Sequence, residues 1–141
     1  MKKYLFILFV SLFIVSQSSC TKDKSSSDPE PETYNVLYEL SVIENSGDIE
    51  LSWLESGNVK KEETNPSMPW KKEYANFKSG DSVSFDFNIS LVPGTNLKYS
   101  WQVSYSGPSG GDGVGPVTID AHVADTTPAI IGAGGWNVKL P

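Results

Sequence analysis

The chain contains no arginine, one cysteine and one histidine among its 141 residues. With Cys20 as the only cysteine, no intramolecular disulfide can form, so a folded domain must be stabilised by its core. Metal and nucleophilic sites need several converging groups, and His122 has only Asp120, two residues earlier, as a neighbouring candidate. We interpret His122 as a solvated residue on a strand face. The sequence therefore predicts a non-enzymatic protein without a metal or another cofactor.

Positive charge is also scarce: the chain has eleven lysines and seventeen acidic residues, so its net charge is −6. Without residues 1–19, nine lysines remain against the same seventeen acids, which gives −8. Nucleic-acid binding requires clustered cationic side chains that displace counterions from the phosphates. The pairs Lys60-Lys61 and Lys71-Lys72 are too short to supply such a cluster. We therefore expect no nucleic-acid partner.

Long apolar runs are absent except at the N-terminus, where residues 4–15 read YLFILFVSLFIV after Lys2 and Lys3. A membrane-spanning helix needs about 20 apolar residues, so this run is short for that role. A charged start followed by a short apolar run is typical of a signal peptide. The alternative is a short N-terminal membrane helix that stays in place.

The apolar run is followed by Ser18, Ser19 and Cys20. This arrangement resembles the lipobox of bacterial lipoproteins, in which the chain is cut before the cysteine and the thiol is acylated. The resemblance implies that residues 1–19 are a signal peptide and that Cys20 carries palmitate-type acyl chains, which anchor the protein durably in a bilayer. The alternative is an ordinary secretory peptide followed by a free cysteine, an unfavourable state in an oxidising compartment.

Residues 20–32 are polar, charged and proline-containing, and we expect a flexible tether because such a segment buries no apolar area. The pair Lys22-Asp23 resembles the charged export tag of surface lipoproteins of the Bacteroidetes group. Thr21 differs from the Asp that retains lipoproteins at the inner membrane. These resemblances imply a location at the outer membrane. They leave open whether the protein lies on the cell surface or on the periplasmic face.

From residue 33 to residue 141 the apolar period is two, which indicates half-buried strands. The first stripe consists of Tyr34, Val36, Tyr38, Leu40 and Val42. The two strongest stripes are Val83, Phe85, Phe87, Ile89 and Leu91, then Leu97, Tyr99, Trp101, Val103 and Tyr105. Weaker strands are expected at 49–53, 59–64, 72–77, 117–123 and 136–140, with the highly charged 59–64 as an exposed edge.

About eight short strands without a helical period predict an all-β domain over residues 33–141. We expect an antiparallel immunoglobulin-like β-sandwich of seven or eight strands, and a small closed barrel is the alternative. The glycine-rich residues 106–115 are expected to form a long flexible hairpin or crossover loop. A phosphate site is disfavoured there because no lysine and no helix accompany the glycines, and Asp112 alone is too few carboxylates for calcium.

Four aromatic side chains are the candidate contacts to a partner or ligand: Trp70, Tyr74, Tyr105 and Trp136. Trp53 and Trp101 fall on apolar stripes, and we assign them to the core. Trp70 follows Pro69 in an expected loop, so it either plugs one end of the sandwich or presents a flat ring for stacking. A sugar-binding platform would need two or three such exposed rings.

Three short motifs suggest a family: Y-E-L at residues 38–40, I-x-L-x-W at 49–53 and M-P-W-x-K at 68–72. Together they resemble the MmpS-like lipoproteins and membrane-anchored proteins. The resemblance implies a small immunoglobulin-like β-domain of a kind that in some members accompanies lipid exporters.

The leading functional hypothesis is a membrane-anchored lipoprotein whose β-sandwich binds or supports another cell-envelope component, including a transporter. The alternative is a surface glycan-binding module that uses exposed aromatic rings. A passive structural or adhesive surface protein is a third hypothesis that the sequence does not separate from the first.

Overall fold

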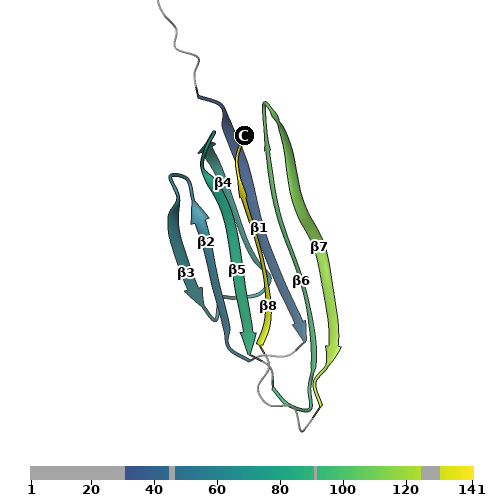
Figure 1. The fold of residues 1–141 in the computed structure, drawn as a ribbon. Coiled ribbons are helices and arrows are strands. Elements are labelled where there is room, and N and C mark those ends of the chain that lie inside the picture. The colour runs from purple at the N-terminus through teal and green to yellow at the C-terminus, as the bar shows by residue number, and fades with distance from the viewer. Residues whose placement is uncertain (1–30, 45–46, 91, 125–130) are drawn as a thin grey trace, which may run out of the picture. The chain divides into compact units, whose positions relative to one another are not determined.

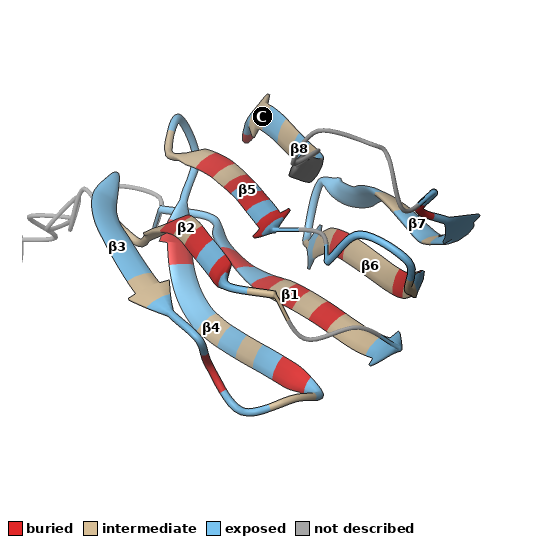
Figure 2. Ribbon diagram, turned by 90° about the horizontal axis from the view of Figure 1, so that it is seen from below, coloured by how far each residue is buried: buried red, intermediate tan, exposed pale blue. Residues whose placement is uncertain are grey.

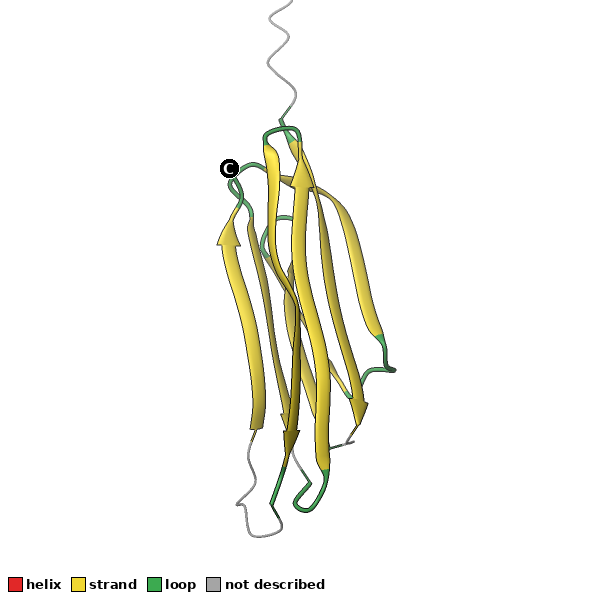
Figure 3. Ribbon diagram, turned by 90° about the vertical axis from the view of Figure 1, so that its right-hand side faces the viewer, coloured by secondary structure: helices red, strands yellow, loops and turns green. Residues whose placement is uncertain are grey.

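The computed structural model describes residues 31–44, 47–90, 92–124 and 131–141, except for the side chains of residues 131 and 132. Cys20, Leu91 and residues 125–128 lie outside the described residues. Pro31–Pro141 form one compact unit, and its described part contains strands and loops but no helix (Figures 1 and 3). The strands are β1 (Thr33–Glu44), β2 (Ile49–Glu55), β3 (Val59–Thr64), β4 (Trp70–Lys78), β5 (Ser82–Ser90), β6 (Asn96–Gly107), β7 (Gly110–His122) and β8 (Ile131–Lys139).

The strands form two four-stranded antiparallel sheets. The first sheet has the order β4-β1-β6-β7 and the second has the order β3-β2-β5-β8, and the two pack face to face (Figure 2). The prediction of an antiparallel β-sandwich is thereby confirmed, with eight strands, and the closed barrel is not formed. Each sheet has two edge strands, so the sandwich has two lateral margins, one between β3 and β4 and one between β7 and β8.

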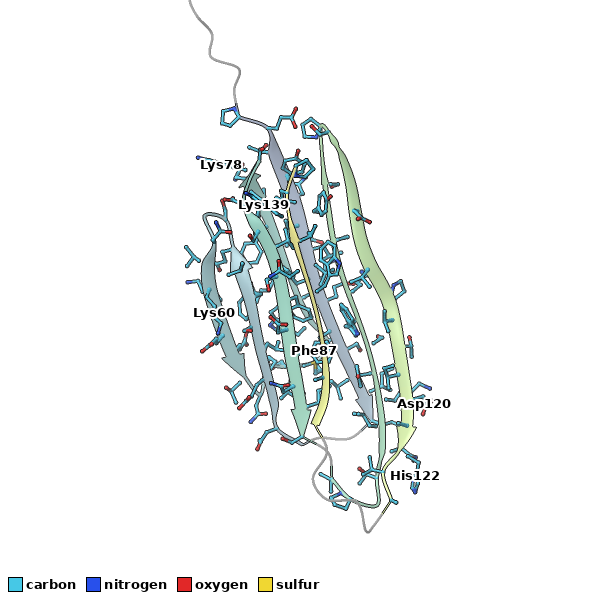
Figure 4. All side chains as sticks on the ribbon, in the orientation of Figure 1. Lys60, Lys78, Phe87, Asp120, His122 and Lys139 are labelled. Atoms are coloured by element: carbon cyan, nitrogen blue, oxygen red, sulfur yellow. The ribbon has the colours of Figure 1, made fainter. Side chains whose placement is uncertain are left out.

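The core lies between the sheets and is built by the predicted alternation of apolar residues. The inward rows of β1, β2, β5 and β6 interdigitate, and Phe87 lies in the middle of the sandwich (Figure 4). Tyr38 joins the sheets, because its hydroxyl donates a 2.8 Å hydrogen bond to the Leu54 carbonyl, and burial raises its pKa. The fully buried side chains are Tyr34, Val36, Tyr38, Leu40, Phe77, Val83, Phe85, Phe87, Ile89 and Val103.

The glycine-rich residues 106–115 do not form the predicted long loop. β6 continues to Gly107, a tight turn follows, and β7 begins at Gly110. A Cβ on Gly111 would lie 2.6 Å from the carbonyl oxygen of Tyr105, and one on Gly113 would lie 2.5 Å from that of Val103. The glycines are therefore needed for the close approach of the two strands, and the segment is a tight hairpin rather than a long flexible one or a crossover loop.

The two ends of the sandwich carry different parts of the chain. The described chain begins at the end that also carries the β2–β3, β4–β5 and β6–β7 turns and the C-terminus (Figure 1). Lys78 and Lys139 lie near this end, whereas Asp120 and His122 lie at the opposite one (Figure 4). His122 is exposed, and its Nδ1 lies 2.9 Å from the side-chain oxygen of Asn96.

Candidate functional site

The margin between β3 and β4 is closed by charged and polar side chains. Lys72 points inward from β4, and its Nζ lies 5.8 Å from the ring centroid of Trp53 and 5.9 Å from that of Trp70. The same Nζ lies 3.9 Å from Glu63, and the indole nitrogen of Trp70 donates to that carboxylate at 3.0 Å. Cation–π and hydrogen-bond contacts thus join the two edge strands.

A second chain of hydrogen bonds closes the same margin. The indole nitrogen of Trp53 donates to the Tyr74 hydroxyl at 2.8 Å, and this hydroxyl donates to Glu55 at 2.9 Å. Partial burial is the main cause that raises the pKa of the Tyr74 hydroxyl. Tyr74 is half-buried within this network rather than presented to solvent.

Trp70 is a core residue and offers no free face to a ligand. Only 5% of it is exposed, and its ring stacks on Phe85 at 5.5 Å and meets Trp53 edge-on at 5.0 Å. The register explains this position, because Trp70 pairs with Leu40 and so joins the inward row of its sheet. Its prediction as a contact residue is corrected, and β4 begins two residues before the expected strand.

The margin between β7 and β8 is built differently, and it brings together the other two predicted contact residues. Tyr105 of β6 and Trp136 of β8 come from opposite sheets and stack with ring centroids 6.3 Å apart and planes inclined by 23°. Both are half-buried. The pair spans the gap between the sheets without the charged groups that close the opposite margin.

β7 lacks a covering strand from the second sheet. None of its residues is buried, although its register places Ile119 beside Tyr99 on the inward row. Ile119 is 39% exposed, and Val114 and Val117 are only half-buried. An apolar row that should face the core thus stays accessible along this margin.

β8 is the edge strand without protection. Edge strands usually carry charges or prolines that prevent pairing with another chain. β3, β4 and β7 follow this rule, whereas β8 carries neither between Gly132 and Val138. The protecting residues are Lys60, Lys61, Glu62 and Glu63 in β3, Lys71, Lys72 and Glu73 in β4, and Asp112, Pro116 and Asp120 in β7.

We define the β7–β8 margin as Tyr105, Trp136, the apolar row of β7 and the free main-chain edge of β8. It combines exposed apolar area with unpaired backbone groups, which is the chemistry that binds an added strand. No family model, curated protein or solved structure matches this chain.

The contribution of β7 and β8 to this margin was not predicted from the sequence. The uncharged run AIIGAGGWNV, residues 129–138, was a usable signal, since few edge strands lack a charge over such a length. Among the described residues, no group of His, Cys, Asp and Glu side chains gathers closely enough to hold a metal ion. The described part of the chain also contains no helix long and apolar enough to cross a membrane.

Proposed function

We propose that this protein is a non-enzymatic lipoprotein of the outer membrane whose β-sandwich binds another envelope protein at the β7–β8 margin. The observation that carries the proposal is the unprotected edge of β8 beside the uncovered apolar row of β7. The signal-peptide pattern of residues 1–19 and the resemblance of Ser18, Ser19 and Cys20 to a lipobox support the anchor. The resemblance to the MmpS-like proteins supports a transporter component as one class of partner.

The physical basis is strand addition. A free edge presents main-chain N–H and C=O groups that an extended segment of a partner can satisfy. A strand added beside β8 would extend the second sheet over β7 and bury Val117 and Ile119. Burial of apolar surface contributes about 25 cal/mol per Å² before the costs of association are subtracted. The margin between β3 and β4 is a poorer site for strand addition, because charged side chains protect both of its edge strands.

The test compares two lysine substitutions on the outer face of the same sheet. Ala133→Lys places the charge on the edge strand β8, and Ser84→Lys places it on the interior strand β5. Both lipidated variants and the unchanged protein are used as bait with detergent-solubilised envelope membranes. We expect the partner to be recovered with the unchanged protein and with Ser84→Lys, but lost with Ala133→Lys. Recovery of the monomer alone in several detergents contradicts the proposal.

The anchor is tested separately by the mass of the mature chain. We expect a chain that begins at Cys20 with attached acyl groups, and we expect Cys20→Ala to abolish both the cleavage before residue 20 and the acylation. A mature chain that lacks Cys20 contradicts the anchor.

A further inference from the structure

The outer face of the β4-β1-β6-β7 sheet carries a groove that runs across the strands. Its volume is about 240 Å³. We propose that this transverse groove, whose exposed lining is mostly apolar, binds a neutral oligosaccharide through contacts with its C–H groups and through hydroxyl, amide and carboxylate groups, rather than by stacking on aromatic rings. The proposal goes beyond the protein partner at the β7–β8 margin and does not depend on it. The polar side chains that line the groove are Glu39, Ser41, Lys71, Ser100 and Gln102.

The strand register places these side chains in two adjacent rows. Ser41 of β1 pairs with Ser100 of β6, and Glu39 pairs with Gln102 on one side. On its other side Glu39 pairs with Lys71 of β4. Residues two apart on a strand share one face, so both rows point to the outside of the sandwich.

The row formed by Lys71, Glu39 and Gln102 is held in place by contacts among these side chains and with Glu73. Lys71 Nζ lies 3.2 Å from Glu39 and 2.8 Å from Glu73. The Gln102 amide nitrogen donates to the Glu39 carboxylate. These contacts orient Glu39 and Gln102 before a ligand arrives, which lowers the entropic cost of binding.

In the row formed by Ser41 and Ser100, hydrogen-bonding groups remain available to a ligand. The hydroxyls of Ser41 and Ser100 make no hydrogen bond to another described residue, and each can both donate and accept. The Gln102 carbonyl oxygen remains an acceptor beside them. A ligand whose hydroxyls both donate and accept matches this mixed set, as a sugar does.

Apolar and electrostatic features narrow the ligand class. Pro69 and Pro116 line the groove together with the polar rows, and their rings provide apolar surface for the C–H groups of a sugar ring. Lys71 is the one cation of the lining, and it is paired with Glu39 and Glu73. Because no unpaired cation is left in the lining, the groove favours a neutral sugar over an anionic one.

The same face extends beyond the groove, which points to a chain of sugars rather than to one. A second depression of about 520 Å³ is lined by Asn35, Leu37, Glu73, Ser104 and Ser106 among others. This part of the face is recessed because its side chains are small: it carries serines, and Gly113 lies opposite Ser104. From Asn35 to Ser41 the strand β1 spans about 20 Å, long enough for several sugar units.

The experiment measures binding by calorimetry with the full lipidated chain in a zwitterionic detergent, which has no sugar headgroup. The probes are cellohexaose, xylohexaose, maltohexaose and mannohexaose. Ser100→Tyr fills the groove, and its matched control, Ser84→Tyr, places the same ring on the outer face of the opposite sheet. Gln102→Ala removes one polar contact without adding volume, and its control is Asn88→Ala on the opposite sheet.

We expect at least one hexasaccharide to bind the unchanged chain and both controls equally. Ser100→Tyr is expected to weaken binding at least tenfold, and Gln102→Ala about fivefold, the effect of one lost hydrogen bond. Binding to none of the four probes overturns the proposal. Binding that Ser100→Tyr and Gln102→Ala leave unchanged overturns it as well, because the sugar would then lie elsewhere.

Discussion

At the scale of single residues, Asp81 connects two turns at the end of the sandwich where the described chain begins. Its Oδ2 accepts hydrogen bonds from the backbone N–H of Lys78 at 2.9 Å and of Gly57 at 3.2 Å, and from the Ser56 hydroxyl at 3.4 Å. Partial burial alone would raise the pKa of this carboxyl, but the three donors outweigh it and hold the pKa below its ordinary value. The carboxylate thus stabilises the β2–β3 and β4–β5 turns together.

We predict that Asp81→Asn lowers the free energy of unfolding by about 1–2 kcal/mol at pH 7, because hydrogen bonds to a charged acceptor are replaced by weaker ones. A pKa that is lower in the folded state stabilises the protein above the pKa of the unfolded chain. This contribution is lost as the pH falls through the folded pKa. The difference between Asp81→Asn and the unchanged protein should therefore shrink below about pH 4.

The measurement is urea unfolding of residues 21–141 at pH 7 and pH 3. Asp86→Asn is the matched control, since Asp86 is exposed on β5 and accepts only a 3.4 Å hydrogen bond from Ser84. If Asp81→Asn costs the same at both pH values, the charge of Asp81 does not stabilise the turns.

At the scale of elements, Gly134 sets how closely β8 approaches the core. A Cβ at this position would lie 2.5 Å from Cζ of Phe87 and 3.3 Å from the indole nitrogen of Trp101. Phe87 is 2% exposed and packs against Phe85, Tyr99 and Trp101, so its ring has little room to move. β8 therefore needs a residue without a side chain on its inward face.

We predict that Gly134→Ala destabilises the protein by about 1–3 kcal/mol, the usual cost of overpacking a core. Without a collision, alanine would be the better residue in a strand, so the sign of the change is informative. Thermal and urea unfolding give the measurement. Gly135→Ala is the control and should cost less, because its Cβ mainly meets the flexible carboxylate of Asp86 at 2.4 Å, besides the Phe85 carbonyl oxygen at 3.0 Å. A neutral or stabilising effect of Gly134→Ala contradicts the prediction.

The strands that were predicted well are those whose alternation is regular. β5 and β6 carry large apolar residues at every second position, and both faces follow directly from that period. The first half of β7, residues 110–116, escaped prediction because glycine has a low strand propensity, whereas the place of these residues depends on close approach to β6. Trp70 was assigned to a loop because Pro69 precedes it, whereas β4 is an edge strand that begins directly after this proline.

The candidate site was harder to predict than the fold. Tyr105 and Trp136 were both chosen from the sequence, but their contact depends on which strands share a sheet and which faces are uncovered. The same holds for the transverse groove, whose Glu39, Lys71 and Gln102 come from three strands. The alternation within a single sequence predicts whether a residue faces inward or outward, but it does not predict which residue of a neighbouring strand lies beside it.

At the scale of the whole molecule, the proposed anchor and the described fold together imply an orientation. Ten residues lie between Cys20 and Pro31, and the eleven Cα–Cα steps from one to the other span at most about 40 Å. Pro31 lies at the end with the β4–β5 turn, whereas the β3–β4 connection lies at the opposite end. The twelve residues of β1 extend about 40 Å between these ends. We therefore expect the β4–β5 turn to face the membrane and the β3–β4 connection to point away from it.

This orientation can be measured because the chain has a single cysteine. When Cys20 is acylated, an added cysteine is the only free thiol, so Ser79→Cys in the β4–β5 turn and Ser67→Cys in the β3–β4 connection each accept one donor dye. Both positions are exposed. In vesicles with acceptor-labelled headgroups, we predict a higher energy-transfer efficiency from residue 79 than from residue 67. Each variant released from vesicles by detergent provides the zero-transfer control. Equal efficiencies would indicate a domain that lies flat on the membrane, and a higher efficiency from residue 67 would place the opposite end at the bilayer. Either result contradicts an upright domain.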